Sequence, residues 1–287
     1  MMQQLLSAYA ESLRPQAGNV YCMDCFDLMA RLEPASIDAI ITDMPYGTTA
    51  CAWDTVVDLP RWWASVKRVL KPRGALVTTA SQPFTSALVM SNPAWFRYEW
   101  IWRKNQSTGM MNARYRPLKE HENVLVFSPL PTRDNQFGVE TSQYYPQGVT
   151  QTRQIARSKS QIGAVNNLRG LQTMVGKHYI REQTDFPKSI IEIDVEVGLH
   201  PTQKPVALYE YLIRTYTQPG EVVLDPFAGS GTTAVACLNT DRQFIAGDFT
   251  LAYVEIARRR IAQWRRDDHI EVAPGVFQRS LFVEAAP

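Results

Sequence analysis

The sequence lacks any long apolar run, and no stretch approaches the roughly 18 consecutive apolar residues that a membrane-spanning helix needs. Its first residues, MMQQLLSAYAESLRP, have neither the basic start nor the apolar core of a secretory signal. Apolar residues make up 45% of the chain and charged residues 20%, which is typical of a globular protein. These features favour a cytoplasmic protein with no membrane partner.

Metal and phosphate-binding motifs are also lacking. Cys22 and Cys25 form a CxxC, but no second Cys or His pair follows at zinc spacing. The pair His121 and Glu122 would need a histidine at position 125 to form HExxH, and Leu125 stands there. No GxxxxGK[ST] is present, which argues against a P-loop nucleotide triphosphatase. We therefore expect no metal.

The chain lacks a large excess of either charge, since 30 Lys and Arg side chains stand against 28 Asp and Glu and the formal net charge is only +2. The distribution is uneven, because residues 131–190 carry eight Lys and Arg side chains against four Asp and Glu. Such a polar, basic segment favours a surface for a polyanion, although on charge alone a solvated loop face explains it equally well.

The chain alternates short apolar strands with helical stretches, and we see no internal repeat. Strands are expected at 19–22, 37–43, 75–80, 96–104, 122–128, 221–225 and 243–248, and helices at 60–70, 84–91, 205–217, 232–239 and 251–264. This alternation predicts an α/β fold with a mostly parallel sheet and helices on both faces. In such sheets ligands bind at the carboxyl ends of the strands.

The polar stretch interrupts this alternation and is too long for an ordinary connection, so we interpret it as an insertion. The resulting division is 1–130 for the first half of the main domain, 131–189 for the insertion, 190–266 for the second half, and 267–287 for a C-terminal extension.

The stretch VVLDPFAGSGTTA (222–234) has the form of a strand, an acid, a glycine-rich turn and a helix. Gly229 and Gly231 allow a sharp turn and close approach of a ligand to the backbone. The next strand ends in Asp248, whose position suits ribose hydroxyls. The turn lies too late in the chain for a dinucleotide fold, so the sheet must be completed by upstream strands. These features favour an adenosine-containing ligand without a pyrophosphate.

Another expected strand, at 37–43, ends in the run TDMPYG. Here an acid, Asp43, is followed by Met44, Pro45 and Tyr46. A carboxylate, a proline and an aromatic ring therefore follow the end of a core strand, where a ligand is expected.

Three motifs in this order resemble those of S-adenosylmethionine-dependent DNA amino-methyltransferases of the β-class: TDMPYG, then HPTQKP (200–205), then DPFAGSGTT. The resemblance covers roughly residues 18–130 and 187–262, and it includes YCMDCFDLM, SQPFTSALV, HENVLVF and FPKSII. It implies a Rossmann-like methyltransferase fold with permuted motif order, S-adenosylmethionine as cofactor and double-stranded DNA as partner. Dimers are common in this class, so a homodimer is compatible with the resemblance.

The resemblance also assigns roles to residues. It implies an active site formed by Asp43, Met44, Pro45 and Tyr46. It implies a cofactor site formed by Asp24, Thr202, Gln203, Lys204, Asp225, Phe227, Gly229, Ser230, Gly231, Thr232 and Asp248. The basic insertion takes the place of the target-recognition region, with Arg153, Arg157, Lys159, Arg169 and Lys177 as candidates for DNA contacts.

The chemistry explains the residue types of the active site. An exocyclic amine of adenine or cytosine is a poor nucleophile, because its lone pair is delocalised into the ring. The Asp43 carboxylate and the carbonyl of residue 44 can accept both amine hydrogens, which directs the lone pair towards the methyl donor. Tyr46 can stack on a base that has been flipped out of the duplex.

One position departs from the usual Asp-Pro-Pro-Tyr. Met44 replaces a proline, yet it still precedes Pro45 and is therefore restricted to extended backbone. We expect a somewhat looser site.

An acid at position 43 resembles the adenine-N6 enzymes, whereas serine is commoner there in cytosine-N4 enzymes, so the resemblance favours N6-adenine methylation. N4-cytosine methylation, methylation of RNA or of a protein glutamine, and a catalytically silent DNA-binding module stay open as alternatives. Cytosine-C5 chemistry is excluded because no cysteine follows a proline. The recognition sequence and a partner in restriction-modification are not revealed.

Overall fold

The computed structural model describes residues 14–47, 55–132, 140–157, 178–196, 203–266, 269–273 and 276–279. The chain forms two compact units, of which the second consists of residues 146–188 and the first of the remainder. No helix among the described residues is both long and apolar enough to cross a membrane.

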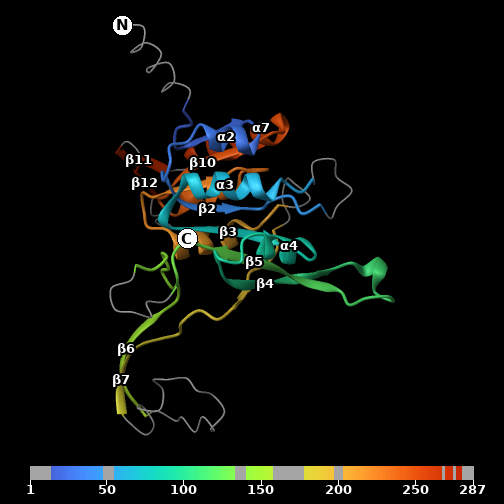
Figure 1. The fold of residues 1–287 in the computed structure, drawn as a ribbon. Helices are drawn as coiled ribbons and strands as arrows, with labels where there is room; N and C mark the ends of the chain where they lie inside the picture. Colours follow the sequence, from blue (N-terminus) through green and yellow to red (C-terminus); the bar gives the residue numbers. More distant parts are fainter. Residues whose placement is uncertain are drawn as a thin grey trace, which may run out of the picture. The chain divides into compact units, whose positions relative to one another are not determined.

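The first unit is built on one eight-stranded sheet (Figure 1). In spatial order its strands are β1 (Asn19–Cys22), β10 (Gln243–Asp248), β9 (Val222–Asp225), β2 (Ile37–Thr42), β3 (Leu70–Ala80), β5 (Lys119–Phe127), β4 (Phe96–Thr108) and β8 (Ile190–Glu192). The first five are mutually parallel, whereas β5 runs antiparallel to both of its neighbours. The predicted mostly parallel sheet is confirmed, and strands from the end of the chain lie between β1 and β2.

Helices cover both faces of the sheet, as the alternation predicted. One face packs against α2 (Cys25–Ala30), α3 (Leu59–Val69) and α4 (Phe84–Ser91), and the other against α5 (Val206–Tyr216), α6 (Thr232–Asn239) and α7 (Leu251–Arg266). Strand β2 is a continuous apolar run because both of its faces are buried: Ile40 packs on the first face, while Ala39 and Ile41 pack on the second.

Local sequence signals fix the starts of two helices on the first face. The Asp24 carboxylate accepts a hydrogen bond from the backbone N–H of Phe26, and the Asp58 carboxylate accepts one from Arg61, each at 2.8 Å. Both acids therefore act as N-caps. In α3 the side chains of Trp62 and Val66 lie four positions apart, so both are buried against the sheet.

The central pair of strands, β9 and β2, marks the point at which the strand order reverses. The chain leaves β9 towards α6 on one face and leaves β2 towards α3 on the other. The carboxyl ends of these strands diverge into different connections and leave a crevice, which is the usual ligand site of such sheets.

Several elements extend beyond those expected. β3 begins at Leu70 rather than near residue 75, and its pairing with β2 shifts register between Leu70 and Ala75. In this part Gly74 lies against the Asp38 carbonyl, where a Cβ would be only 2.6 Å away. Beyond residue 104, β4 continues to Thr108 and a 3-10 turn, η1 (Met110–Asn112), before β5 returns. The C-terminal extension contains β11 (His269–Ala273) and β12 (Val276–Arg279), which pair antiparallel.

The second unit contains a two-stranded antiparallel sheet made of β6 (Thr150–Arg157) and β7 (His178–Thr184). The boundaries of this unit, 146 and 188, fall inside the insertion expected at 131–189.

Candidate active site

A cavity of about 880 Å³ lies at the carboxyl ends of the central strands. Four aspartates line it, and each lies at the end of a strand or within two residues of it: Asp24 after β1, Asp43 after β2, Asp225 in β9 and Asp248 in β10. Besides these acids, the predicted site residues that line it are Met44, Pro45, Tyr46, Gln203, Lys204, Phe227, Gly229, Ser230 and Thr232. The fold thus brings together residues that are up to 224 positions apart, from Asp24 to Asp248.

The Asp43 carboxylate is surrounded by donors from three elements. Its Oδ1 accepts hydrogen bonds from the hydroxyls of Tyr46 and Thr79, while its Oδ2 lies 2.5 Å from Nζ of Lys204. Because a carboxylate can accept roughly four hydrogen bonds, two on each oxygen, Oδ2 keeps one position for a further donor.

Lys204, which the resemblance assigns to the cofactor site, is thus paired with Asp43. Glu122 lies on the other side of the ammonium, with Oε2 3.5 Å from Nζ, and its Oε1 is 2.5 Å from Nζ of Lys104. Only 10% of the Lys204 side chain and 12% of the Glu122 side chain are exposed. Two carboxylates and two ammonium groups therefore alternate along this wall of the cavity.

The charges in this row stabilise one another. Burial alone would raise the pKa of Glu122, but the Lys204 and Lys104 ammonium groups outweigh it and hold the pKa below its usual value. Burial likewise opposes charge on Lys204, yet Asp43 and Glu122 raise its pKa. Both side chains are consequently charged at neutral pH. Glu122 Oε2 is buried and has no hydrogen-bond partner among the described residues.

The Tyr46 side chain contacts an aromatic ring, a carboxylate and an ammonium group. Its ring stacks on Phe84 with centroids 5.6 Å apart and planes inclined by 22°, and the Lys204 ammonium lies 5.8 Å from its centroid. Burial, reinforced by the neighbouring Asp43 charge, raises the pKa of the Tyr46 phenol well above its usual value. The hydroxyl therefore stays protonated and donates to Asp43, and Phe84 supports the ring.

The Met44 side chain is only 2% exposed and belongs to the apolar core beneath α2, α3 and α4. Packing of this side chain anchors the backbone at the position where the resembled family carries proline.

The glycine turn is organised by Asp225, which is 3% exposed. Its carboxylate accepts hydrogen bonds from the Thr42 hydroxyl at 2.6 Å, from the Phe227 backbone N–H at 3.1 Å and from the Thr233 hydroxyl. Burial nevertheless raises the pKa of Asp225 to about 6. Asp225 thus joins β9 to β2 and α6, in addition to lining the cavity.

The two glycines of the turn differ in their surroundings. Gly231 has φ +81°, and a Cβ there would lie 2.7 Å from Cβ of Ala257 in α7, so this glycine permits close helix packing. It does not line the cavity. Gly229 has φ +49° with open space where a Cβ would be, and its N–H donates to the Asp248 carboxylate at 3.1 Å. Gly229 therefore leaves room on the cavity side.

The residues fit an adenosine-containing cofactor. Asp24 and Asp248 lie at the carboxyl ends of two adjacent strands, since Cys22, the last residue of β1, is in register with Asp248 of β10. The Asp248 carboxylate is held by the N–H groups of Gly229 and Thr250, the latter at 2.8 Å, and it stays at the cavity wall. Acids so placed can accept hydrogen bonds from ribose hydroxyls and from an exocyclic amine. Phe26, Phe227 and Phe249 add apolar surface beside them.

The sequence analysis missed Thr79, Lys104, Glu122 and Tyr209, which contact or surround the Asp43 group. One signal was available: Glu122 is an acid at the start of the apolar run ENVLVF, and Lys104 comes two residues after the aromatic run WIW of the adjacent strand. A charge at the end of a buried strand suggests a buried partner.

Of the five residues predicted to contact DNA, the structure describes two, and their role in DNA binding stays a prediction. Arg153 is exposed on β6, and Arg157 ends the same strand. Lys159, Arg169 and Lys177 lie outside the described residues, as does Thr202 of the cofactor set.

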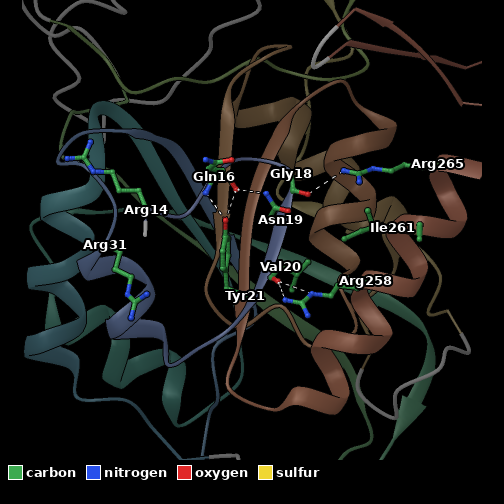
Figure 2. Close-up of a pocket in the computed structure, with 11 residues that line it drawn as sticks. Arg14, Gln16, Gly18, Asn19, Val20, Tyr21, Arg31, Arg258, Ile261 and Arg265 are labelled. Atoms are coloured by element: carbon green, nitrogen blue, oxygen red, sulfur yellow. Dashed lines mark hydrogen bonds between the residues drawn. The ribbon is translucent and has the colours of Figure 1, made fainter. Parts of the chain in front are cut away.

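A second hollow, of about 690 Å³, lies beside the edge strand β1 and is lined by Arg14, Arg31, Arg258 and Arg265 (Figure 2). Arg258 donates to the Val20 carbonyl at 2.7 Å, and Arg265 donates to the Gly18 carbonyl at 3.4 Å. These guanidinium groups satisfy the carbonyl of Val20 in the edge strand and that of Gly18 just before it. We therefore assign this hollow a structural role.

Comparison with known proteins defines the class. The DNA methylase family of N6 and N4 methyltransferases matches residues 37–259. The Type II methyltransferase M.HpaI of Haemophilus parainfluenzae is 28% identical over 258 residues, or 84% of this chain and 73% of that enzyme. The DNA adenine methyltransferase YhdJ of Escherichia coli (strain K12) is 42% identical over 77 residues, only 27% of this chain and 26% of that enzyme.

Solved structures agree. The M1.HpyAVI–SAM complex has a TM-score of 0.53 and 25% identity, covering 84% of this chain and 98% of that one. The cytosine-N4-specific PvuII DNA methyltransferase shares the fold, with a TM-score of 0.57 and 16% identity over 87% of this chain and 92% of that one.

Fold and site thus define a methyltransferase with a Rossmann-like sheet. The chain belongs to the N6/N4 DNA methylase family: it is a DNA methyltransferase that uses S-adenosylmethionine. The fold, the cofactor and the family predicted from the sequence are confirmed.

Proposed function

We propose that the protein transfers a methyl group to the N6 amine of an adenine that is flipped out of double-stranded DNA. The observation that carries the proposal is the Asp43 carboxylate, which lies at the cavity with one acceptor position on Oδ2 still available.

The chain's own groups would prepare the amine for attack. Oδ2 of Asp43 accepts one amine hydrogen and the carbonyl of Met44 accepts the other, so the nitrogen lone pair is directed away from both. The hydroxyls of Tyr46 and Thr79 fix the carboxylate through its other oxygen. S-adenosylmethionine, when bound, would supply an electrophilic methyl group: the nitrogen lone pair would form a bond to the methyl carbon while the carbon–sulfur bond breaks, the neutral thioether would leave, and the amine proton held by Asp43 would be released through that carboxylate.

The geometry also supports binding of an extruded base. The cavity is enclosed by aromatic and charged side chains, and an amine inside a duplex could not reach Asp43 at the end of a buried strand. The Tyr46 ring, backed by Phe84, provides a rigid apolar wall for the base.

The choice of adenine is supported by the acid at position 43 and by the similarity to a DNA adenine methyltransferase over 77 residues. N4-cytosine methylation uses the same arrangement of acceptors and is the second candidate.

The test is a product analysis. Unmethylated plasmid DNA is incubated with the protein and S-adenosylmethionine, digested to nucleosides and analysed by mass spectrometry. N6-methyladenine is expected, and mapping its positions gives the recognition sequence. N4-methylcytosine instead would overturn the assigned base and keep the assigned acceptors.

The assigned role of Asp43 is tested by Asp43→Ala. Methyl transfer is expected to be abolished, because the amine loses its charged acceptor, while cofactor affinity by calorimetry stays close to that of the parent protein. Full activity of the variant would refute the role. Cofactor binding in the same sample serves as the control for folding.

A further inference from the structure

The hairpin formed by the end of β4, η1 and the start of β5, residues 103–119, runs out beyond the rest of the sheet (Figure 1). We call it the β4–β5 arm. Its two strands are held together by hydrogen bonds, including one from the Thr108 hydroxyl to the Lys119 carbonyl at 3.3 Å, and the Ser107 hydroxyl donates to Glu120 at 2.9 Å.

The tip of the arm is an ordered turn with apolar side chains on its outside. Gly109 has φ +90° and starts η1, and the N–H of Tyr115 donates to the Asn112 carbonyl at 2.9 Å. Met110 is nevertheless 72% exposed, Met111 96% and Tyr115 86%. An ordered turn that presents three large apolar side chains to solvent is typical of a surface that another molecule covers.

The charge of the arm indicates what that molecule is. Residues 103–119 contain five Lys and Arg side chains and no Asp or Glu. Arg103 is paired with Glu192 and Lys104 with Glu122, whereas Arg114 and Arg116, which flank Tyr115, form no ion pair with a described residue. Exposed guanidinium groups around an apolar tip complement a polyanion with stacked apolar layers, which is the chemistry of DNA.

The position of the arm ties it to the active site. Lys104, Gln106, Thr108 and Lys119 of its two strands line the cavity. Met110 follows Thr108 by two residues, or about 7 Å of extended chain. The apolar tip therefore begins close to the opening through which a base would enter.

We propose that the β4–β5 arm binds the DNA duplex, that Met110, Met111 and Tyr115 enter the space vacated by the flipped base, and that Arg114 and Arg116 contact the flanking phosphates. The proposal rests on the base flipping proposed above. Insertion of apolar side chains between base pairs compensates for lost stacking and keeps the base extruded.

The test uses the full-length protein and two duplexes that contain the mapped target. In one duplex the target base is paired normally, and in the other it lies opposite an abasic site, where extrusion costs less. The test variant is Met110→Ala, Met111→Ala and Tyr115→Ala combined. The control is Met90→Ala on α4, because Met90 is as exposed as Met110, at 72%.

For the combined variant we expect kcat/KM on the paired duplex to fall by about tenfold or more, since a stacking contact contributes on this scale. On the abasic duplex the loss should shrink to less than about threefold, with cofactor affinity unchanged on both. A 2-aminopurine at the target position should fluoresce less with the variant than with the parent protein. Met90→Ala should behave as the parent protein.

An undiminished rate on the paired duplex would overturn the proposal, and so would an equal loss on both duplexes, because neither agrees with insertion beside an extruded base. If the product is N4-methylcytosine, the proposed adenine specificity fails, and the same pair of duplexes built around that cytosine tests the arm. Arg114→Gln with Arg116→Gln should weaken DNA binding and reduce its salt dependence, and an unchanged salt slope would contradict the phosphate contacts.

Discussion

At the scale of residues, the site is governed by how a buried lysine is shared between two acids. Lys204 Nζ is 2.5 Å from Asp43 and 3.5 Å from Glu122. Lysine and acid side chains are rarely this buried unless they are paired. In the proposed mechanism, a lysine bound only to Asp43 would compete with the substrate amine for Oδ2, and the attraction of Glu122 for Lys204 would keep Asp43 available as an acceptor.

This view makes a prediction for Glu122→Gln, which keeps the shape of the side chain and removes its charge. Lys204 should then bind Asp43 more tightly, and kcat should fall by about tenfold with little change in cofactor affinity. In a Lys204→Met background the same substitution should have a much smaller effect, which corresponds to a coupling of about 1–3 kcal/mol in a double-mutant cycle.

Glu120→Gln is the matched control, because Glu120 lies on the same strand and is exposed. It should leave kcat unchanged. Additive effects of the substitutions at 122 and 204 would show that Glu122 does not act through Lys204.

At the scale of elements, the glycine turn serves both packing and binding. Gly231 lets α6 approach α7, and Gly229 lies at the cavity wall. The sequence presents them as one motif, but the structure gives them different tasks.

The different tasks of the two glycines can be tested by measuring the free energy of unfolding of alanine variants in the absence of cofactor. Gly231→Ala places a methyl group 2.7 Å from Ala257 Cβ at φ +81°, so the helices must move apart. We expect a loss of about 2–4 kcal/mol in the free energy of unfolding, from overpacking and backbone strain together. Gly229→Ala meets open space and should cost only about 1 kcal/mol, for its left-handed backbone. Equal losses in denaturant titrations of the two variants would contradict this assignment.

Many of the secondary-structure elements, and the place of the cavity at their ends, could be predicted from the sequence. Buried strands such as β2 and capped helices such as α2 follow from local patterns, and acids at strand ends mark the cavity because parallel strands share one carboxyl edge. The pairing of Lys204 with Asp43 and Glu122 could not be predicted, because it joins residues distant in the sequence through side-chain geometry. The outer part of the β4–β5 arm was also missed, since both of its faces are exposed and no apolar alternation marks it as strand.

At the scale of the whole molecule, the chain forms one large unit, which contains the candidate active site, and a separate small unit. Residues 146–188 are compact by themselves and contain the β6–β7 sheet. The sequence analysis assigned target recognition to this region because of its charge and its place in the motif order. Its attachment points lie on the first unit: the Tyr144 ring contacts Tyr98 of β4, and the Ser189 carbonyl accepts a hydrogen bond from Ile101 of the same strand.

These attachment points make removal of the unit feasible. Tyr98 and Ile101 are three residues apart on β4, roughly 10 Å, which a Gly/Ser linker of about six residues can span. The variant with residues 146–188 replaced by such a linker should keep its cofactor affinity, because every described residue of the cavity belongs to the first unit. It should lose site-specific methylation of plasmid DNA, since its charged surface for the duplex is reduced. If the linker variant still methylates the mapped sequence selectively, target recognition lies in the first unit, and the β4–β5 arm becomes the principal DNA-binding element.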